Sequence, residues 1–297
     1  MGRPGLIVSA RTKSEGNPKM GLLHPVKQLG KAVAPGIYWD LQRRYHRGLL
    51  RPVEKAFAKR HGPRVVAGPF AGMKYLGEAT GSRLLPKLCG SYEVELHPLL
   101  EKIFTQRYEK VIDVGCAEGY YAVGFAMKFP QTSVFAYDID PGAQRLCREL
   151  SRMNGVADRV SVCGGCEPET LRELAHERVL LICDCEGYEY DLLDNEVVGD
   201  MAGWDLIVEL HDDSSGGARA AALRARLDKS HDTVVIPPSE RDPDCFPATH
   251  FLPKRWRKRA LDEGRPVKQS WLWAVGRVQD VPLAGSAEAR EDHGRRS

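Results

Sequence analysis

The segment at residues 111–119, Val-Ile-Asp-Val-Gly-Cys-Ala-Glu-Gly, has the composition of a ligand-binding turn between a strand and a helix. Gly115 permits a tight turn, and Gly119 lets the helix start close to the strand, so the backbone amides of the turn would face a ligand. Asp138 ends the next apolar run, where a carboxylate can accept two hydrogen bonds from ribose hydroxyls. Together these residues predict a site for a nucleoside ligand.

The details of this turn discriminate between nucleoside ligands. A dinucleotide fingerprint requires Gly-x-Gly-x-x-Gly, whereas Ala117 and Tyr120 occupy its second and third glycine positions. The sequence has no Gly-x-x-x-x-Gly-Lys-Ser/Thr, so a P-loop site is not supported. Glu118 at the tip would repel a pyrophosphate but not the zwitterionic methionine end of S-adenosylmethionine. Asp113 suits the ammonium group of that compound, directly or through water, so S-adenosylmethionine is the favoured ligand.

A second group of polar residues follows the fourth and fifth apolar runs and could act at a reaction centre: Asp184, Glu186, Glu209, His211 and Asp212. Methyl transfer to a hydroxyl needs an aligned nucleophile and benefits from a base. We favour His211 as that base, because its unperturbed pKa of about 6.5 suits proton abstraction near neutrality, with Asp184 or Glu209 orienting it. The alternative is that His211 only hydrogen-bonds a loop and that proximity drives the reaction.

Two sets of residues invite a metal, and we favour neither as a metal site. The carboxylates after the fourth and fifth runs could hold Mg²⁺, which prefers a few carboxylates together with water and substrate oxygens. Cys163 and Cys166 form one short-spaced pair, and Cys183 and Cys185 form another. The second pair has a single intervening residue, which departs from the usual spacing of a structural zinc site. We expect the eight cysteines to be reduced thiols.

These side chains need a scaffold that brings successive strand ends to one edge. Short apolar runs alternate with helical stretches, which implies a parallel sheet covered by helices on both faces. We therefore predict an α/β fold with a doubly wound, mostly parallel seven-stranded sheet, in which two late strands form an antiparallel edge. The expected strands are 111–114, 134–137, 160–163, 179–183, 206–210, 233–236 and 271–275, and the expected helices are 120–128, 143–153, 168–176 and 218–227.

The N-terminal part differs from this body in charge. Residues 1–64 carry 14 Lys and Arg against 3 Asp and Glu, a net +11, which leaves −8 for the rest of a chain whose total is +3. Such a basic arm could meet nucleic acid, anionic lipid or an acidic partner, or mediate a homo-oligomer, but without a nucleic-acid motif we consider nucleic acid the weaker case. The expected divisions are a disordered segment (1–23), a basic helical extension (24–64), the main domain beginning with a hairpin at 65–75 (65–280), and a flexible tail (281–297). Because Pro52 interrupts the helical pattern of the extension, we expect a kink there or two helices that meet near Arg51.

Taken in order, these segments resemble the class I S-adenosylmethionine-dependent methyltransferases, which have a Rossmann-like fold, and more narrowly the FkbM-type methyltransferase family. The segments that carry the resemblance span roughly residues 90–276: Gly90-Ser-Tyr-Glu-Val-Glu-Leu96, Asp113–Gly119, Tyr137-Asp-Ile-Asp-Pro141, Asn154-Gly155, Asp184-Cys-Glu-Gly-Tyr-Glu189 and Glu209-Leu-His211. The chain departs from the pattern at Ala117, where many class I turns have glycine, and in its basic N-terminal segment, which leaves the choice of substrate open.

The resemblance implies a role for each matching position. The residues that it assigns to the methionine end of the cofactor are Asp113, Gly115, Cys116, Ala117 and Gly119. It also assigns Asp138 to the ribose, Ile139 to a flank of the adenine, Gly164 and Gly165 to a close backbone approach to the adenine ring, and Glu93 to the cofactor mouth.

The family is typified by methyl transfer to hydroxyl oxygen, so we expect O-methylation of a small metabolite or saccharide. Transfer to nitrogen, which would need no His211, and a noncatalytic binding module that keeps the fold are the alternatives. The basic stretch 251–259 could cap the site and attract an anionic substrate, or could simply be a solvated helix. No apolar run approaches the roughly 18–20 residues that cross a bilayer, and no secretory h-region is present, so we expect a cytoplasmic protein.

Overall fold

The computed structural model describes residues 35–174, 178–211, 215–265 and 269–277, with side chains from residue 48 onward. The chain divides into two compact units, residues 1–52 and residues 53–297, and the candidate site lies wholly in the second. Helix α2 (Pro35–His61) includes Pro52, so the two separate helices that we considered for this region do not form. The predicted disordered segment and the predicted tail lie outside the described residues.

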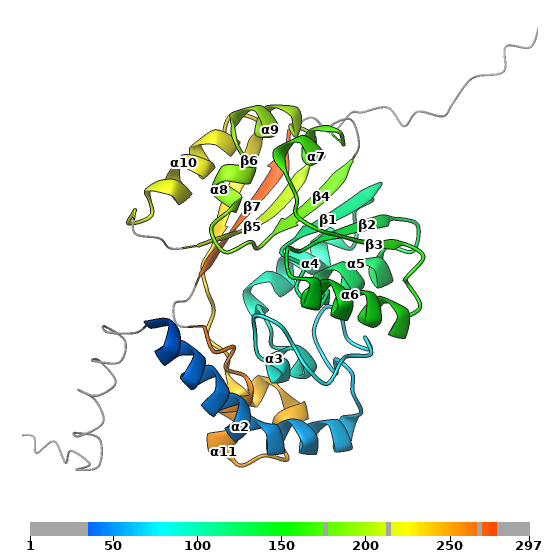
Figure 1. Cartoon of the computed structure of the whole chain (residues 1–297), viewed down its shortest axis with the longest axis vertical. Helices are drawn as coiled ribbons and strands as arrows, with labels where there is room; N and C mark the ends of the chain where they lie inside the picture. Colours follow the sequence, from blue (N-terminus) through cyan, green and yellow to red (C-terminus); the bar gives the residue numbers. More distant parts are fainter. Residues whose placement is uncertain (1–34, 175–177, 212–214, 266–268, 278–297) are drawn as a thin grey trace, which may run out of the picture. The chain divides into compact units, whose positions relative to one another are not determined.

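The second unit contains a seven-stranded sheet in the order β3-β2-β1-β4-β5-β7-β6 (Figure 1). The neighbours from β3 to β5 pair in parallel, whereas β7 runs antiparallel to both β5 and β6. This order confirms the predicted doubly wound α/β fold and its antiparallel edge. The strands are β1 (Lys110–Val114), β2 (Ser133–Tyr137), β3 (Val160–Cys163), β4 (Val179–Cys183), β5 (Asp205–Leu210), β6 (His231–Ile236) and β7 (Ser270–Gly276).

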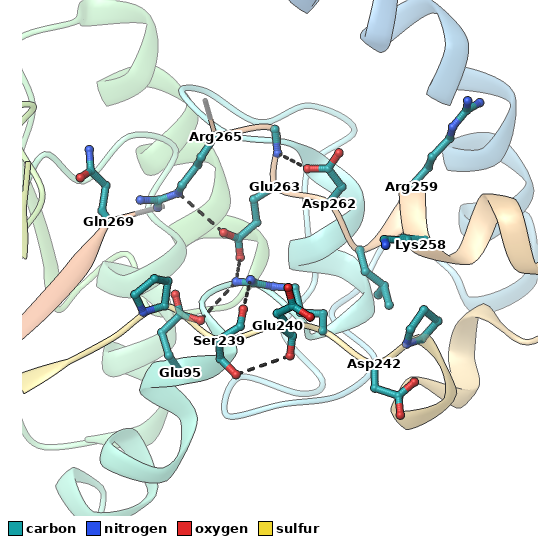
Figure 2. A pocket seen from close by; sticks show the side chains of 15 residues that line it. Glu95, Ser239, Glu240, Asp242, Lys258, Arg259, Asp262, Glu263, Arg265 and Gln269 are labelled. Carbon is teal, nitrogen blue, oxygen red and sulfur yellow. Dashed lines mark hydrogen bonds and ion pairs between the residues drawn. The ribbon is translucent and has the colours of Figure 1, made fainter. Parts of the chain in front are cut away.

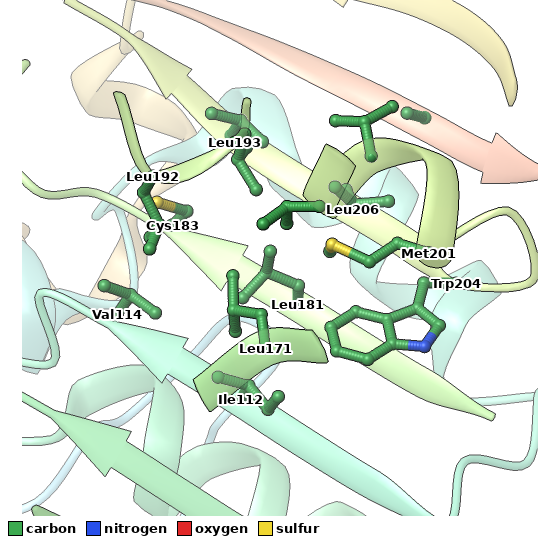
Figure 3. Close-up of a cluster of buried hydrophobic side chains, with 14 of the residues drawn as sticks. Ile112, Val114, Leu171, Leu181, Cys183, Leu192, Leu193, Met201, Trp204 and Leu206 are labelled. Atoms are coloured by element: carbon green, nitrogen blue, oxygen red, sulfur yellow. The ribbon is translucent and has the colours of Figure 1, made fainter. Parts of the chain in front are cut away.

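Helices cover both faces of the sheet (Figure 1). On one face Leu171, Val197 and Leu223, each 0% exposed, pack with strand residues such as Leu181 in a single apolar cluster (Figure 3). These side chains come from α7 (Pro168–Arg172), α9 (Asn195–Asp200) and α10 (Ala218–Leu227). The other helices are α3 (Leu84–Cys89), α4 (His97–Ile103), α5 (Tyr120–Lys128), α6 (Pro141–Met153), α8 (Glu189–Leu192) and α11 (Lys254–Ala260), with 3₁₀ turns η1 (Val94–Leu96), η2 (Pro243–Cys245) and η3 (Pro247–Thr249).

The strand register determines where the site can form. The inner strands are buried on both faces, which explains why they read as continuous apolar runs rather than alternating ones. Val114 at the end of β1 lies opposite Tyr137 in β2 and Cys183 in β4, and Cys183 lies opposite Val208 in β5. The segments that follow β1, β2, β4 and β5 therefore meet at one edge of the sheet.

The region before β1 differs from the expectation. Residues 64–75 form a loop closed by one antiparallel bridge, Arg64 to Lys74, rather than a two-stranded hairpin. In it the Val65 amide donates to the Met73 carbonyl at 2.8 Å. Helices α3 and α4 were not predicted, because six or seven residues make too few turns for an apolar period to show.

A buried ion pair ties this region to the turn after β1. Glu118, which we expected at the exposed tip of the turn, is 0% exposed, so that expectation is wrong. Its carboxylate accepts hydrogen bonds from the Lys87 ammonium and the Tyr75 hydroxyl at 2.5 Å each, and from the Thr80 amide at 2.9 Å. Burial raises the pKa of Glu118, but the Lys87 charge and these hydrogen bonds outweigh it and hold the pKa below its ordinary value. Glu118 therefore anchors the turn to the rest of the domain.

We predict that Lys87→Met lowers the free energy of unfolding by about 3–5 kcal/mol, because it leaves a buried carboxylate without its cation. The double variant Lys87→Met with Glu118→Gln should recover part of this loss, since the amide oxygen can still accept from Tyr75 and Thr80. Urea unfolding followed by circular dichroism measures both. Arg145→Met is the matched control: it removes an exposed pair with Glu149 and should change stability by less than about 1 kcal/mol. If Lys87→Met and Arg145→Met lowered the free energy of unfolding equally, the anchoring role of Glu118 would be contradicted.

Candidate active site

The turn after β1 and the segment after β4 cross at the edge of the sheet. The Asp184 amide donates to the Val114 carbonyl at 2.9 Å, and the Asp184 carbonyl lies directly over Gly115. A Cβ atom at Gly115 would overlap that carbonyl, and Gly115 also has a φ of 83°, in the region that favours glycine. Sequence reasoning foresaw the tight turn at Gly115, whereas the backbone crossing is visible only in the fold.

The hydrogen bonds of the turn correct one expectation. The amides of Gly115 and Cys116 donate to the Tyr137 carbonyl at 2.9 and 3.0 Å, and the Ala117 amide donates to Asp138 Oδ2 at 2.9 Å. Gly119 donates to the Cys116 carbonyl at 2.7 Å. These amides are satisfied within the protein and do not face a ligand as we predicted. With its donors engaged, the turn suits an ammonium group, which needs acceptors, better than a phosphate, which needs donors.

The adenosine end of the predicted site lies after β2 and β3. Asp138 Oδ1 accepts the Asp140 amide at 2.8 Å, and since each carboxylate has about four acceptor positions, two remain for ribose hydroxyls. Ile139 follows with 85% of its surface exposed, so a ligand that covered this side chain would gain the free energy of burying apolar surface. Gly165 lies beside it, at 3.8 Å from the Ile139 side chain to the Cβ position, and both Gly164 and Gly165 are exposed. An exposed apolar side chain beside two glycines, whose backbone carries no side chains, could accommodate the planar adenine ring.

Backbone strain gathers at the same edge. Among the described residues, Glu93, Ala117 and Glu186 have a positive φ without being glycine, at 47°, 48° and 56°. Each conformation costs of the order of 1–3 kcal/mol, and such strain persists mainly where function or surrounding packing requires it. Ala117 thus takes the left-handed conformation that a glycine would adopt. Having alanine instead of glycine at this position therefore adds backbone strain but leaves the path of the turn unchanged.

Asp113 is placed more deeply than sequence reasoning implied. Its side chain is 3% exposed, and one oxygen accepts the Ala122 amide in the first turn of α5 at 2.9 Å. Burial raises the pKa of Asp113 to about 8. The direct contact with an ammonium group is therefore less supported than the contact through water.

The three predicted catalytic residues converge after β4 and β5. His211 Nε2 lies 3.4 Å from Asp184 Oδ1 and 3.4 Å from Glu209 Oε2, and 3.6 Å from Glu186 Oε2. The Glu209 side chain is 1% exposed and that of His211 is 11% exposed, whereas Glu186 is 88% exposed. Asp212 lies outside the described residues.

Sequence reasoning missed the residue that orients the histidine. Glu189, 0% exposed, places Oε1 at 3.1 Å from His211 Nδ1, and the Tyr190 hydroxyl donates to the His211 carbonyl at 2.8 Å. Burial lowers the pKa of His211, but the hydrogen bond with Glu189 and the charges of Asp184 and Glu186 raise it above its ordinary value. In the sequence, Glu189 could be noticed only as the last acid of the Asp184–Glu189 motif, which does not indicate a contact with His211.

Arg265 joins this cluster to Glu93. Its guanidinium forms ion pairs with Glu93 and Glu209 and donates to the Tyr92 hydroxyl at 3.2 Å. Glu93 is 1% exposed and also accepts from the Tyr121 hydroxyl, so it belongs to a buried network beside the reaction end rather than to an open mouth. Arg265 lies in the segment between β6 and β7, where no sequence motif marks it.

A cavity of about 680 Å³ opens next to this network (Figure 2). Arg265, Glu263 and Arg241 line it, and Glu263 forms ion pairs with both arginines. Lys258 and Arg259, from the basic stretch that we singled out, also line the cavity and form no ion pair with a described residue. Part of the stretch does form a helix, α11, and its residues border a cavity rather than only solvent.

Comparisons with known proteins agree with this architecture. A family model described as ribosomal protein L11 methyltransferase (PrmA) matches residues 97–182, from α4 into β4, the part that carries the turn after β1. The chain has the class I methyltransferase fold. A curated relative, the probable cobalt-precorrin-6B C(15)-methyltransferase (decarboxylating) of Pyrobaculum calidifontis, is 38% identical over 76 residues, which is 25% of this chain. The match spans 39% of that relative's length.

Solved structures that match part of the chain do so at low sequence identity. The O-methyltransferase TomG of Streptomyces achromogenes, solved in complex with SAM, is 14% identical with a TM-score of 0.43, and the match covers 61% of this chain and 78% of TomG. The precorrin 8W decarboxylase of Methanobacterium thermoautotrophicum is 17% identical with a TM-score of 0.41, covering 62% of this chain and 90% of that protein. None of the helices that the structure describes combines the length and the apolar character of a membrane span.

We predict that Gly115→Ala weakens the binding of S-adenosylhomocysteine by at least about 10-fold and lowers the unfolding temperature, because the new Cβ displaces the Asp184 backbone. Gly155→Ala is the matched control: Gly155 also has a positive φ, 69°, but nothing lies within 4 Å of its Cβ position. The Gly155→Ala variant should be less stable because of backbone strain alone, and it should bind S-adenosylhomocysteine as the wild type does. Isothermal titration calorimetry compares the two, and equal affinities would show that the crossing does not shape the ligand site.

Proposed function

We propose that this protein is an S-adenosylmethionine-dependent methyltransferase of the FkbM type that methylates a hydroxyl of a small metabolite or saccharide. The observation that supports it most is the crossing of Gly115 and Asp184, because one backbone contact joins the predicted cofactor turn to the acidic histidine cluster. Methyl transfer is a displacement in which nucleophile, methyl carbon and sulfur must be in line, so cofactor and acceptor sites have to adjoin.

The residues after β2 and β3 support the choice of cofactor. Asp138 retains acceptor positions for the ribose, and Ile139 with Gly164 and Gly165 offers an apolar seat for adenine. The family model that matches residues 97–182 bears on the same part of the chain. The bound cofactor would supply an activated methyl group, which leaves the protein to align the acceptor and to accept its proton.

The reaction end supports oxygen as the acceptor atom. A hydroxyl loses its proton as it attacks, and His211 Nε2, held by Glu189 through Nδ1, is placed to receive it beside Asp184 and Glu209. The cavity next to Arg265 is a candidate seat for the rest of the acceptor. Lys258 and Arg259 at its rim favour an acceptor with an anionic group, such as a sugar acid.

Transfer to nitrogen is the second candidate, and one observation favours it. Glu93, Asp184, Glu209 and Glu263 gather at the reaction end, and such an excess of carboxylates would attract a protonated amine. An amine that attacks in its neutral form needs no histidine base. The dependence of the reaction on His211 therefore separates the two candidates.

We predict that Asp138→Ala weakens S-adenosylhomocysteine binding by at least about 10-fold, since it removes two hydrogen bonds to a charged acceptor, each contributing about 1.5–3 kcal/mol. Calorimetric titration measures the affinity. Asp158→Ala, which removes an exposed carboxylate before β3, is the control and should bind as the wild type does. If neither wild type nor control binds the compound, the proposed function is wrong.

We predict that His211→Ala lowers methyl transfer by about 10²–10⁴-fold and leaves S-adenosylhomocysteine affinity within about twofold, because the residue acts on the acceptor and not on the cofactor. The assay follows an isotopically labelled methyl group from S-adenosylmethionine into the small-molecule fraction of a cell extract. His250→Ala removes an exposed histidine outside the cluster and should retain full transfer. Undiminished transfer by His211→Ala would favour a nitrogen acceptor.

A further inference from the structure

The side chains of Asp184, Glu209 and His211 approach one another without forming a hydrogen bond. Each offers one ligand atom, and these atoms all lie within 4.8 Å of one another. His211 Nε2 stands 3.4 Å from an oxygen of each acid. Ligand atoms around a divalent ion at about 2.1 Å are separated by about 3.0–3.5 Å, so the two distances from Nε2 match those of a coordination sphere.

The partner on the other side of the imidazole determines what Nε2 can do. An ionised carboxylate can only accept, so the contact between Glu189 and Nδ1 places the proton on Nδ1. In the neutral ring, Nε2 then carries a lone pair that faces the oxygens of Asp184, Glu209 and Glu186. Such a set of acceptors is satisfied by a metal cation between them or by a second proton on the imidazole. A buried carboxylate on the far ring nitrogen is also the usual support of a metal-binding histidine.

Arg265 does not supply that cation. It pairs with Glu209 through Oε1, whereas Oε2 is the atom that faces His211. The Asp184 side chain has no ion-pair partner among the described residues other than His211. The Glu209 side chain is 1% exposed, and the Arg265 guanidinium contacts it at Oε1. One oxygen from each acid thus remains available on the side of the imidazole.

We propose that Asp184, Glu209 and His211 bind a divalent transition-metal ion. One imidazole nitrogen with two carboxylates suits Mn²⁺, Fe²⁺, Co²⁺ or Zn²⁺ better than Ca²⁺ or Mg²⁺, which prefer oxygen ligands alone. Asp184 is 29% exposed and Glu186 is 88% exposed, so one side of the site is open and could admit a further ligand. The three protein ligands would leave coordination positions on that side.

The role of the ion rests on the proposed function. An acceptor hydroxyl that coordinates the ion has a lowered pKa and loses its proton to solvent. His211 then acts as a ligand of the ion instead of as a free base, and the loss of transfer expected for His211→Ala would follow from loss of the ion. The presence of the ion does not depend on the methyl-transfer proposal.

Titration of the chelator-treated full-length protein with Mn²⁺ tests the proposal, because the electron paramagnetic resonance signal of free Mn²⁺ falls as the ion binds. We expect one ion per chain, and a 100-fold excess of Mg²⁺ should leave most of it bound. Asp184→Asn and His211→Gln should each weaken Mn²⁺ binding by at least about 10-fold. Glu189→Gln should weaken it by about 10–100-fold through loss of the support on Nδ1.

Glu149→Gln is the matched control, since it converts an exposed carboxylate on α6 to an amide and should bind Mn²⁺ as the wild type does. Circular dichroism verifies that each variant is folded. The proposal is overturned if the wild type leaves the Mn²⁺ signal unchanged at millimolar ion. It is equally overturned if folded Asp184→Asn and His211→Gln bind as tightly as the control.

S-adenosylhomocysteine titrations of the same samples separate this inference from the proposed function. If the protein bound S-adenosylhomocysteine but not Mn²⁺, the metal-site proposal would be wrong and the methyltransferase proposal would stand. One bound Mn²⁺ that the ligand variants lose, in a protein that does not bind S-adenosylhomocysteine, would support the ion and contradict the methyltransferase proposal.

Discussion

The close approach of two backbones, at Gly115 and Asp184, is the constraint on which the rest of the edge depends. Strand β1 lies between β2 and β4, so the turn that leaves it has neighbours on both sides, and its amides are already used by the end of β2. On the other side the chain leaving β4 runs directly over Gly115. The fold therefore separates the predicted methyl donor from the reaction cluster by a single backbone crossing, which is the proximity that a displacement reaction requires.

The second constraint is electrostatic. Buried acids surround this crossing, and the partner of each acid decides what it can do. Glu118 forms a buried ion pair with Lys87, and its role is to hold the turn after β1 in place. Burial raises the pKa of Asp113 to about 8, so that acid tends toward its neutral form. Glu209 is shared between Arg265 and the imidazole, which leaves it able to meet a cation at the open side of the site.

Most of the fold could be predicted, and the reasons are local. Strands such as β4 are buried on both faces, so their residues form uninterrupted apolar runs that the sequence displays directly. Helix α5 likewise begins and ends where its pattern indicates. The failures have the opposite cause: α3 and α4 are too short to show a period, and the orientation of Glu118 depends on Lys87, which precedes it by many residues. Neither could be read from a neighbouring pattern.

The candidate site divides in the same way. The types of residue at the ends of β1, β2, β4 and β5 are determined by the sequence, because in a parallel sheet each strand delivers its following residues to the same edge. The distances between those residues are not. That Glu189 holds His211, that Arg265 reaches Glu93 and Glu209, and that three ligand atoms lie within 4.8 Å depend on how distant segments pack. Sequence alone therefore specified which chemical groups are present, whereas the tertiary structure decided which of them face one another, since side-chain contacts between remote segments exist only after the sheet has formed.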